Sequence, residues 1–396
     1  MVSSFQCLPV PQIVFGPGKL YDLPDLYKSY GKRPALVLGK ASLSKQHTWQ
    51  KIKAEISDIF GPDKPPFIQV SSEPTPTLID EAVSLLLQNH VDMVIAIGGG
   101  SVLDAGKAIS AMLVEQAPVM DFLEGVGTRK PEGSKLPFIA VPTTAGTGSE
   151  TTNNAVIRSA KKGFKKSLRH KNYCPNLALV DPEMTLSCPP SLTATCGMDC
   201  FTQLTEAYLS TRASALTDSL SLDGIHAIAR SLETVFQDGS NLEARSDMAY
   251  ATLLSGITLS NAGLGTVHGL AGTLGGFFDI PHGTACGTLM AITNKTTLDT
   301  LRKSTIKTDT ETTALRKFSN LGRIFSKESA KTDNWYQDFF IDELIRLTDL
   351  FELPTLEIFG MNSTDLEKIT SASSNKFNPV QLSREDLMHI LSARLR

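Results

Sequence analysis

The sequence predicts two domains of different class: an α/β domain with a parallel sheet over residues 1–190, and an all-helical domain over residues 191–396. Three observations lead to this prediction. The chain has 396 residues, which is more than one hydrophobic core usually organises. In the first half, short apolar runs rich in β-branched residues alternate with helical patterns, as is typical of a parallel sheet with crossover helices. After Pro189 and Pro190 the strand pattern stops, and we place the domain boundary there.

The strands of the α/β domain are expected at apolar runs that are followed directly by glycine, proline or a polar residue. They cover residues 35–38, 67–70, 93–97, 138–141 and 178–180. A helix is expected over residues 77–90, because Leu78, Ala82, Leu85 and Leu86 recur at helical spacing. The polar, proline-containing segment before this helix supplies its turn and its cap.

The second domain shows only helical patterns. Apolar residues follow a spacing of three to four positions at Leu222, Ile225, Ile228, Leu232 and Val235. Leu253 and Ile257 continue the same kind of pattern farther along the chain. Another helix is expected to begin at Gly197-Met198-Asp199. We therefore predict that this half is all-helical.

Charge and composition exclude several classes of function. The 38 Lys and Arg residues nearly balance the 41 Asp and Glu residues, so we expect neither nucleic acid nor a membrane surface as a partner. Pro9 and Pro11 interrupt the only segment that could serve as a signal peptide, and no apolar run approaches the roughly 18 residues of a membrane-spanning helix. The six cysteines form no C-x-x-C pair. We expect a cytoplasmic protein with free thiols.

The first candidate binding loop follows the strand at residues 93–97. It reads Gly98-Gly99-Gly100-Ser101 and leads into a helical pattern. Consecutive glycines let the backbone approach a ligand closely, and the N-terminus of the next helix offers N–H groups and a positive dipole end, so phosphate is the expected ligand. The alternative is a tight turn without a ligand, since the loop has neither the G-x-G-x-x-G nor the Walker spacing.

A second loop follows the strand at residues 138–141 and is dense in hydroxyl groups and glycines. It carries Thr143, Thr144, Thr147 and Thr152. Hydroxyl groups suit a pyrophosphate or a ribose, although a solvated loop without a ligand has the same composition. Two such loops at the carboxyl ends of strands in one sheet favour a dinucleotide. We therefore predict that the first domain is a Rossmann-like dinucleotide-binding domain.

Candidate metal ligands lie in the helical domain. Asp199 and Gln203 are four residues apart and share a face of the predicted helix. His268 and His282 are two of only seven histidines, and each is followed by glycine. One carboxylate oxygen and two imidazole nitrogens form a workable ligand set for Zn(II) or Fe(II), and we expect it to face a crevice between the domains. Either histidine taken alone is more often a hydrogen-bonded structural residue.

Taken together, these motifs resemble the iron-containing (group III) alcohol dehydrogenase family. The similarity begins at residues 13–18, includes both loops with Asp104 and Lys107, passes through residues 179–183 and reaches Asn378-Pro379. The resemblance implies an N-terminal dinucleotide-binding domain and a C-terminal metal domain. It also implies an NAD(P)-linked alcohol dehydrogenase, which transfers hydride between the nicotinamide and a metal-polarised alcohol or carbonyl compound.

The resemblance implies roles for individual residues. It places Gly98, Gly99, Gly100 and Ser101 at the pyrophosphate of the cofactor. It places Thr143, Thr144, Thr147, Thr152 and Lys165 along the rest of the cofactor. Asp199, His268 and His282 fall on metal-ligand positions and act in catalysis through the metal. Gln203 falls on a fourth such position.

Three positions depart from the family pattern. Gln203 stands where relatives commonly have histidine, and an amide oxygen is a weaker ligand than imidazole, so retention of the metal and its identity as Fe(II) or Zn(II) stay open. Gly272 stands where many relatives have a proton-relay histidine, so the proton route must differ. Where NAD-preferring relatives tend to have aspartate, this chain has Gly39-Lys40. A cation there would admit the 2′-phosphate of NADP, which we favour over NAD, whereas a solvated Lys40 would carry no such meaning.

We expect an NAD(P)-dependent alcohol dehydrogenase that acts on a small alcohol or aldehyde and forms a homodimer. Three alternatives stay open at this point. A metal-independent reductase of the same fold would account for Gln203. A lyase or cyclase similar to dehydroquinate synthase would use NAD only transiently. A nucleotide-binding protein that has lost catalysis is the third. The sequence does not identify the substrate.

Overall fold

The computed structural model describes residues 2–39, 50, 54 and 66–396. The chain divides into two compact units. The sheet unit consists of Cys7–Pro189 and Asp238–Ala249. The helical unit consists of Met1–Gln6, Pro190–Gln237 and Tyr250–Arg396. Among the described residues, no helix is both long enough and apolar enough to cross a membrane.

The sheet unit contains a six-stranded sheet in which every neighbouring pair of strands is parallel. The strand order is β1-β8-β5-β4-β2-β3. The strands are β1 (Gln12–Phe15), β2 (Pro34–Gly39), β3 (Phe67–Val70), β4 (Met93–Gly98), β5 (Phe138–Pro142) and β8 (Leu177–Val180). This confirms the predicted parallel α/β class, with β1 as a strand that the sequence pattern did not predict.

The order of strands reverses at β2. From β2 the chain adds β3 on one side and then returns to add β4 on the other. Ligands of open α/β sheets bind outside the carboxyl ends of the strands at such a switch point. The strands that flank this point end at Gly39 and Gly98, which brings the predicted glycine loop to the expected place.

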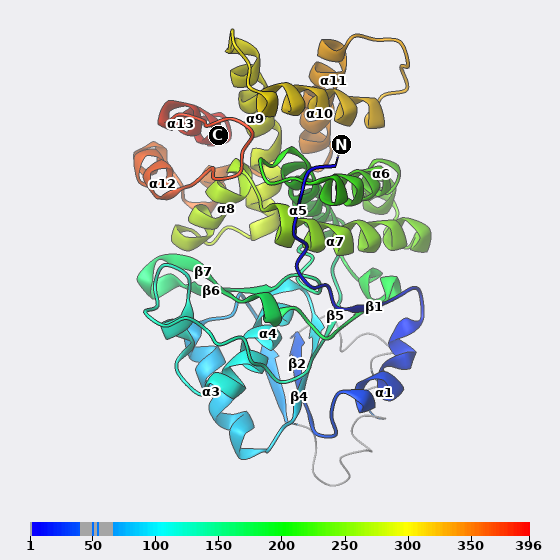
Figure 1. Cartoon of the computed structure of the whole chain (residues 1–396), viewed down its shortest axis with the longest axis vertical. Coiled ribbons are helices and arrows are strands. Elements are labelled where there is room, and N and C mark those ends of the chain that lie inside the picture. The colour runs from blue at the N-terminus through cyan, green and yellow to red at the C-terminus, as the bar shows by residue number, and fades with distance from the viewer. Residues whose placement is uncertain (1, 40–49, 51–53, 55–65) are drawn as a thin grey trace. The chain divides into compact units, whose positions relative to one another are not determined.

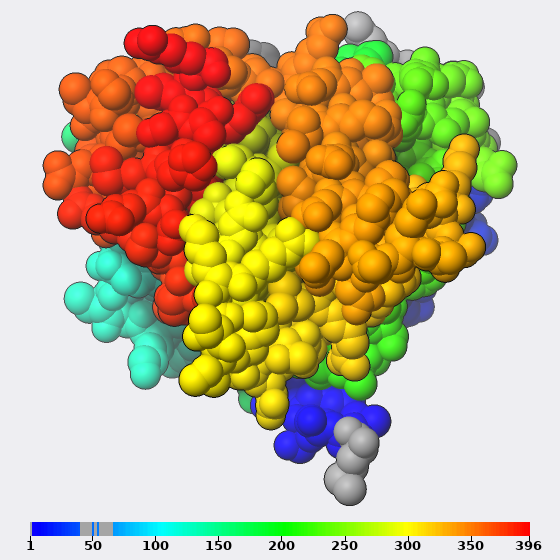
Figure 2. Space-filling view, turned by 90° about the horizontal axis from the view of Figure 1, so that it is seen from above, coloured from blue at the N-terminus to red at the C-terminus, as the bar shows by residue number. Residues whose placement is uncertain are grey.

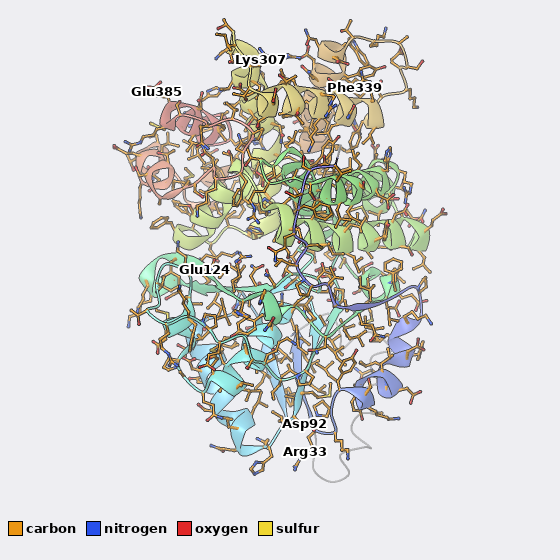
Figure 3. All side chains as sticks on the ribbon, viewed as in Figure 1. Arg33, Asp92, Glu124, Lys307, Phe339 and Glu385 are labelled. Carbon is orange, nitrogen blue, oxygen red and sulfur yellow. The ribbon has the colours of Figure 1, made fainter. Side chains whose placement is uncertain are left out.

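At the amino-terminal ends of β2 and β4, a carboxylate binds backbone N–H groups. Asp92, just before β4, accepts hydrogen bonds from the backbone N–H groups of Lys32 (2.9 Å) and Arg33 (2.8 Å), just before β2. Figure 3 shows Arg33 and Asp92 beside each other at this end of the sheet. Polar backbone groups at the amino edge are thus satisfied within the protein, and the carboxyl edge is the one that presents loops to a ligand.

Alternate residues of β4 face two separate apolar clusters. Val94 and Ala96 belong to one cluster, Met93 and Ile95 to the other, and all four are fully buried. Helices α3 (Pro76–Gln88) and α4 (Gly100–Glu115) cover the first face, whereas η1 (Lys19–Asp22) and α1 (Leu23–Leu26) cover the second. Figure 1 shows α3 and α1 on opposite sides of the strands. A strand that is buried on both faces reads as a continuous apolar run, which is why β4 was predictable.

The helix predicted over residues 77–90 is α3. It begins one residue earlier, at Pro76, and ends at Gln88. The hydroxyl of Thr75 accepts a hydrogen bond from the backbone N–H of Leu78 (3.2 Å), and proline at the first helical position lacks only an N–H that would have no helical partner. The polar segment before the helix therefore supplies the cap, as predicted.

A two-stranded antiparallel hairpin completes the sheet unit and was not predicted. It pairs β6 (Asn154–Ser159) with β7 (Phe164–Arg169). Ala155, Ile157 and Leu168 of these strands are buried in the apolar cluster, and the partly buried Phe164 packs against it. The apolar run is too short and too polar to stand out in the sequence, so the hairpin depends on this tertiary packing.

The helical unit contains only helices among its described residues. The α-helices are α5 (Pro190–Leu209), α6 (Ala215–Gln237), α7 (Leu242–Ala262), α8 (Thr266–Phe277), α9 (His282–Lys303), α10 (Asp309–Phe325), α11 (Asp333–Leu350), α12 (Leu366–Ala372) and α13 (Arg384–Ala393). The part of α7 that belongs to this unit begins at Tyr250. In α6, the predicted apolar residues Ile225, Ile228, Leu232 and Val235 are buried. The predicted all-helical character of this half is confirmed.

The helix that carries Asp199 starts earlier than predicted. The prediction that it begins at Gly197 is wrong, because α5 begins at Pro190. A pair of prolines was interpreted as a linker, but proline fits the first turn of a helix because its missing N–H would be unpaired there. Asp199 therefore lies in the middle of a long, buried helix rather than at its free end.

The core of the helical unit is formed largely by α8, α9 and the C-terminal helices. Leu270, Leu274, Leu289, Ile369 and Ile390 belong to one apolar cluster, and each is fully buried. Figure 2 shows α9 between the C-terminal helix and the α10–α11 pair on the outer face of this unit. The first turns of α8 and α9 are thus fixed by packing over the length of both helices.

Asp181, which follows β8, connects the segment at Gly18 and Leu20 to the end of that strand, and its removal is expected to destabilise the fold. Its buried carboxylate accepts hydrogen bonds from the N–H groups of Gly18 (3.1 Å), Leu20 (2.9 Å) and Glu183 (3.0 Å). Asp181→Ala leaves these donors without this acceptor, so we expect a loss of about 3 kcal/mol in the free energy of unfolding measured in urea. The neighbouring substitution Glu183→Ala, which keeps the same donors paired, should change it by far less. Equal effects of the two substitutions would contradict this role.

Candidate functional site

The two predicted phosphate-binding loops lie side by side. They follow β4 and β5, which are neighbours in the sheet, with Gly98 opposite Pro142. The backbone N–H of Thr143 donates a hydrogen bond to the carbonyl oxygen of Gly98 (3.0 Å). The structure therefore brings the glycine loop and the threonine loop into one continuous surface at the carboxyl edge of the sheet.

Close approach between the loops requires glycine at one position. A Cβ atom at residue 100 would lie 2.6 Å from the side-chain oxygen of Thr147, a distance that real Cβ atoms do not tolerate. At Gly99 the corresponding contact with Thr144 would be 3.4 Å. Gly99 is the N-cap of α4, and no side chain caps this helix. The first N–H groups of α4 are therefore not used by a capping side chain, as an anion site at a helix N-terminus requires.

A buried lysine shapes the threonine loop from inside. The Nζ atom of Lys107 donates hydrogen bonds to the carbonyl oxygen of Ser149 (2.8 Å), the hydroxyl of Thr152 (2.8 Å) and the carbonyl oxygen of Asn154 (2.7 Å). Burial lowers the pKa of Lys107 to about 8, although the nearby Asp104 carboxylate acts in the opposite direction. Thr152, which the sequence places at the cofactor, thus contacts Lys107, and Lys107 is a positioning residue that the sequence analysis left without a role.

Two carboxyl groups accompany this lysine. Asp104 accepts hydrogen bonds from the hydroxyl of Ser149 and from the backbone N–H of Val156 (2.9 Å), and burial raises its pKa. Glu150 is 1% exposed, and its Oε1 atom has no hydrogen-bond partner. Burial raises the pKa of Glu150 to about 7, with a smaller opposing effect of Lys107.

The remaining predicted cofactor residues are placed differently from one another. Gly39 lies beside the first turn of α4, since a Cβ atom there would lie 3.6 Å from a methyl group of Val102. Lys165 forms an ion pair with Glu73 and is nearly buried. Lys40, on which the NADP prediction depends, lies outside the described residues.

Four side chains of the helical unit converge on one point. The Nε2 atom of His268 lies 3.3 Å from the Oδ1 atom of Asp199, and that of His282 lies 3.8 Å from the same oxygen. The Sγ atom of Cys286 lies 3.6 Å from the Nε2 atom of His268 and 3.7 Å from that of His282. One donor atom from each residue lies within 4.8 Å of all the others. This group could hold a metal ion, and three of its four members are predicted ligands.

Glycines explain how these helices come so near to each other. A Cβ atom at Gly283 would lie 2.6 Å from the backbone carbonyl oxygen of Thr195, and one at Gly269 would lie 1.7 Å from that of Ser374. The glycine after each histidine thus lets the first turn of α8 or α9 touch a neighbouring backbone. The contact with Thr195 brings the start of α9, and with it His282, against the helix that carries Asp199.

A second carboxylate of α5 orients His268. Glu206 accepts a hydrogen bond from the Nδ1 atom of the ring (2.7 Å) and from the backbone N–H of Val267 (2.6 Å). With Nδ1 bound to Glu206, the Nε2 atom is directed at Asp199. Histidine ligands of metals usually donate their second ring N–H to a carboxylate in this way.

Sequence reasoning missed both Glu206 and Cys286. Glu206 lies seven residues after Asp199, and Cys286 lies four residues after His282, so each shares a helix face with a residue that was singled out. This spacing was the available signal. It was not used, because the cysteines were interpreted only as free thiols, and the structure does show all six as free.

The charges within this group favour a bound cation. Burial acts to raise the pKa of Asp199, but the two histidines outweigh it and hold that pKa below its usual value. For His268, burial acts to lower the pKa, yet Cys286, Glu206 and Asp199 together raise it well above the usual range. Burial raises the pKa of the Cys286 thiol to about 12. A divalent cation reverses the preference of such a thiol, since its charge favours the thiolate.

Two of the three positions that depart from the family pattern, Gln203 and Gly272, lie in the helical unit. The Oε1 atom of Gln203 accepts a hydrogen bond from the hydroxyl of Ser255 (3.0 Å), and the side chain is buried. At Gly272, in α8, an added Cβ atom would meet nothing within 4 Å. A Cβ atom at this position, which many relatives fill with histidine, would therefore meet no other atom.

Comparison with known protein families covers nearly the whole chain. Residues 10–182 match the family described as iron-containing alcohol dehydrogenase. Residues 193–395 match the C-terminal family of the Fe-containing alcohol dehydrogenases. The two matches correspond to the two halves that the sequence analysis distinguished.

Individual relatives agree with these matches. Alcohol dehydrogenase 4 of Saccharomyces cerevisiae is 35% identical over 294 residues, which are 73% of this chain and 74% of the yeast protein. The NAD-dependent methanol dehydrogenase of Bacillus methanolicus is 32% identical over 69% of this chain and 71% of its own length. The solved alcohol dehydrogenase of Oenococcus oeni superposes with a TM-score of 0.84 at 28% identity, covering 99% of this chain and all of that one.

The buried Glu150 is expected to make stability depend on pH. Its pKa is about 7 in the folded state against 4.5 normally, so between these values the folded protein binds more protons than the unfolded chain. Its contribution is therefore present below pH 4.5 and lost as the pH rises through 7, by at most about 3 kcal/mol. We expect Glu150→Gln to remove this loss, seen as a gain over the wild type in urea unfolding at pH 8 that disappears at pH 4.5.

The exposed Glu81 provides the control for this measurement. Glu81→Gln removes one carboxyl group of the same unit without removing a buried one, so its stability should follow that of the wild type at every pH. A Glu150→Gln variant whose difference from the wild type stayed constant from pH 4.5 to 8 would contradict the role given to burial.

Proposed function

The chain belongs to the iron-containing alcohol dehydrogenase family and is a metal-dependent alcohol dehydrogenase, and we propose how its own residues perform that activity. Asp199, His268 and His282 hold a divalent metal, and the glycine and threonine loops bind the NAD(P) cofactor. The observation that carries this proposal is the convergence of one carboxylate and two imidazoles in the helical unit.

The residues present fit a divalent cation. The three donors are an oxygen and two nitrogens, a set common to zinc and ferrous sites, and Glu206 fixes the ring of His268 from behind. His282 is 27% exposed, whereas Asp199 is 2% exposed, so the group is open on one side only. When bound, such a metal acts as a Lewis acid that polarises the C–O bond of the substrate.

The sheet unit supplies the cofactor site in this proposal. The N–H groups at the start of α4 bind the pyrophosphate, and Thr143, Thr144 and Thr147 present hydroxyl groups beside it. Lys107 holds the backbone of the threonine loop in place through Ser149 and Asn154. A nicotinamide cofactor bound there would exchange hydride, through its C4 atom, with the carbon atom that carries the substrate oxygen.

The proton that accompanies hydride transfer needs a separate route. Gly272 has no side chain, so position 272 cannot carry a proton. With Nε2 of His268 on the metal and Nδ1 bonded to Glu206 at 2.7 Å, that ring has no nitrogen left to accept the proton. Water on the side of His282, the more exposed of the two histidines, is left to receive it.

The alternatives to a metal-dependent dehydrogenase find no support in the relatives. The family matches and the yeast, Bacillus and Oenococcus proteins are all dehydrogenases of alcohols. A lyase, a metal-independent reductase and a non-catalytic protein each rested on the sequence alone, the second of them on Gln203. The relatives also support an alcohol as the substrate class.

The choice of coenzyme belongs to the same proposal. The Bacillus relative is NAD-dependent by name, and we propose that this chain uses NADP in preference, because Lys40 follows Gly39 at the end of β2. The choice between Fe(II) and Zn(II) is taken up below. A homodimer and a cytoplasmic location stay predictions.

Removal of one metal ligand tests the proposed function. We expect His268→Ala to lose bound metal and to lower kcat by at least about 100-fold, because the Lewis acid supplies several kcal/mol of stabilisation to the developing alkoxide. Metal is measured by elemental analysis of the purified protein, and kcat by NAD(P)H absorbance with a panel of small alcohols and aldehydes. The exposed His226 of α6 gives the control, and His226→Ala should retain both. Full activity in metal-free His268→Ala would disprove the proposal.

A charge reversal at the end of β2 tests the coenzyme preference. We expect the wild type to have a higher kcat/KM with NADPH than with NADH, and Lys40→Asp to invert this order, because a carboxylate repels the 2′-phosphate and accepts hydrogen bonds from the ribose hydroxyls. The solvated Lys28, which pairs with Asp25, provides a control of the same charge. A ratio that Lys40→Asp and Lys28→Asp change equally would argue against a role for Lys40.

A further inference from the structure

Cys286 stands out among the four converging side chains because no role for it follows from the family resemblance or from the relatives. It lies in the second turn of α9, one turn after His282, and is fully buried. Its sulfur lies within 3.7 Å of both imidazole Nε2 atoms. The same nitrogens point toward Asp199. A thiol placed among the donor atoms of a metal group is a candidate for the fourth ligand.

The distances between these atoms match those within a tetrahedral zinc site. With Zn–S near ~2.3 Å and Zn–N near ~2.05 Å, tetrahedral angles place sulfur and nitrogen ~3.5 Å apart, and nitrogen and oxygen ~3.3 Å apart. The structure has sulfur–nitrogen distances of 3.6 and 3.7 Å and nitrogen–oxygen distances of 3.3 and 3.8 Å. The remaining pairs of donor atoms lie within 4.8 Å of each other, so a modest contraction of the group would bring all four to one ion.

The competing fourth ligand, Gln203, has a hydrogen-bond partner on a neighbouring helix. Its Oε1 atom, the atom of the amide that can bind a metal, lies 3.0 Å from the Ser255 hydroxyl, which also bonds the carbonyl oxygen of Thr252 at 2.8 Å. Ligation by Gln203 would leave that buried hydroxyl with one partner fewer, and a neutral amide offers less to a borderline metal than a thiolate does. Ligation by Cys286 breaks no such contact.

We propose that Cys286, rather than Gln203, is the fourth metal ligand of this enzyme, beside Asp199, His268 and His282. The resulting Asp-His-His-Cys group prefers Zn(II) to Fe(II). The inference rests on the proposed metal site. Two anionic ligands balance the charge of a divalent ion, and a soft thiolate favours zinc over ferrous iron in a four-coordinate site, which the substrate oxygen would extend to five. The alternative is a thiol that only hydrogen-bonds to the histidines.

Replacement of the native metal by Co(II) tests the ligand directly. The purified enzyme is stripped with a chelator, reloaded with Co(II), and examined for the near-ultraviolet charge-transfer band that a thiolate bound to Co(II) produces. We expect this band in the wild type and in Gln203→Ala, and its loss in Cys286→Ser. Cys196→Ser, at a cysteine of the same unit outside the group, should keep it. A wild-type Co(II) enzyme without the band, or a Cys286→Ser variant that retains it, would overturn the proposal.

Metal affinity gives a second measurement that does not depend on activity. In competition with a chromophoric chelator, we expect Cys286→Ser to bind Zn(II) more weakly by more than the ~10–100-fold that loss of a residue behind the ligands costs, and to lose less affinity for Fe(II). Gln203→Ala should leave the Zn(II) affinity within a few-fold of the wild type. A larger loss of Zn(II) affinity in Gln203→Ala than in Cys286→Ser would assign the fourth position to Gln203 instead.

These measurements separate the two proposals. If His268→Ala abolishes Co(II) binding while the wild type binds Co(II) without a sulfur band, the metal site stands and only the role of Cys286 fails. If His268→Ala keeps its full metal content, the proposed site itself fails. Far-ultraviolet circular dichroism and urea unfolding of each variant establish that a lost band reflects a lost ligand in a folded protein.

Discussion

The imidazole of His268 is held between two carboxylates of one helix. The geometry of the four converging side chains depends on this contact. Glu206 binds Nδ1 at 2.7 Å, and Asp199 faces Nε2 at 3.3 Å. A buried ring with a carboxylate at each nitrogen has one orientation and a strong attraction for positive charge. His282 and Cys286 then approach the same point from α9. A cation at this point satisfies groups that otherwise compete for protons.

Helix packing, rather than local sequence, brings these groups together. α5 supplies two carboxylates on one face, and the first turns of α8 and α9 supply the rings. Gly269 and Gly283 permit backbone contacts that any larger residue would prevent. Because α8 and α9 share one buried apolar cluster, a shift of either helix would move a donor atom away from the group.

The sheet unit achieves a similar arrangement with backbone atoms. Gly100 approaches Thr147 so closely that no side chain fits, and Lys107 secures the threonine loop from below through three hydrogen bonds. A lysine with a pKa near 8 and a glutamate with a pKa near 7 lie in the same buried region. Lys107 thus holds the loop in shape, and no side chain caps the N-terminus of α4.

The sequence by itself determined the parallel sheet, the change to helices near Pro190, the two loops at the strand ends and three of the four converging side chains. Continuous apolar runs, helical periodicity and glycine next to histidine are local signals, and they survive without coordinates. The sequence alone did not predict β6 and β7, which are stabilised by contacts with core residues far away in the chain. It also did not predict that α5 begins at Pro190.

Only the tertiary structure decided which side chains lie beside Asp199, His268 and His282. Cys286 and Glu206 are ordinary residues until α5, α8 and α9 pack together, because a distance across helices is not encoded in the spacing along any one of them. The structure likewise showed Gln203 bound to Ser255 and Lys165 paired with Glu73. Where a motif departs from its family, the substitute is found by what lies nearby in space rather than by what lies nearby in the chain.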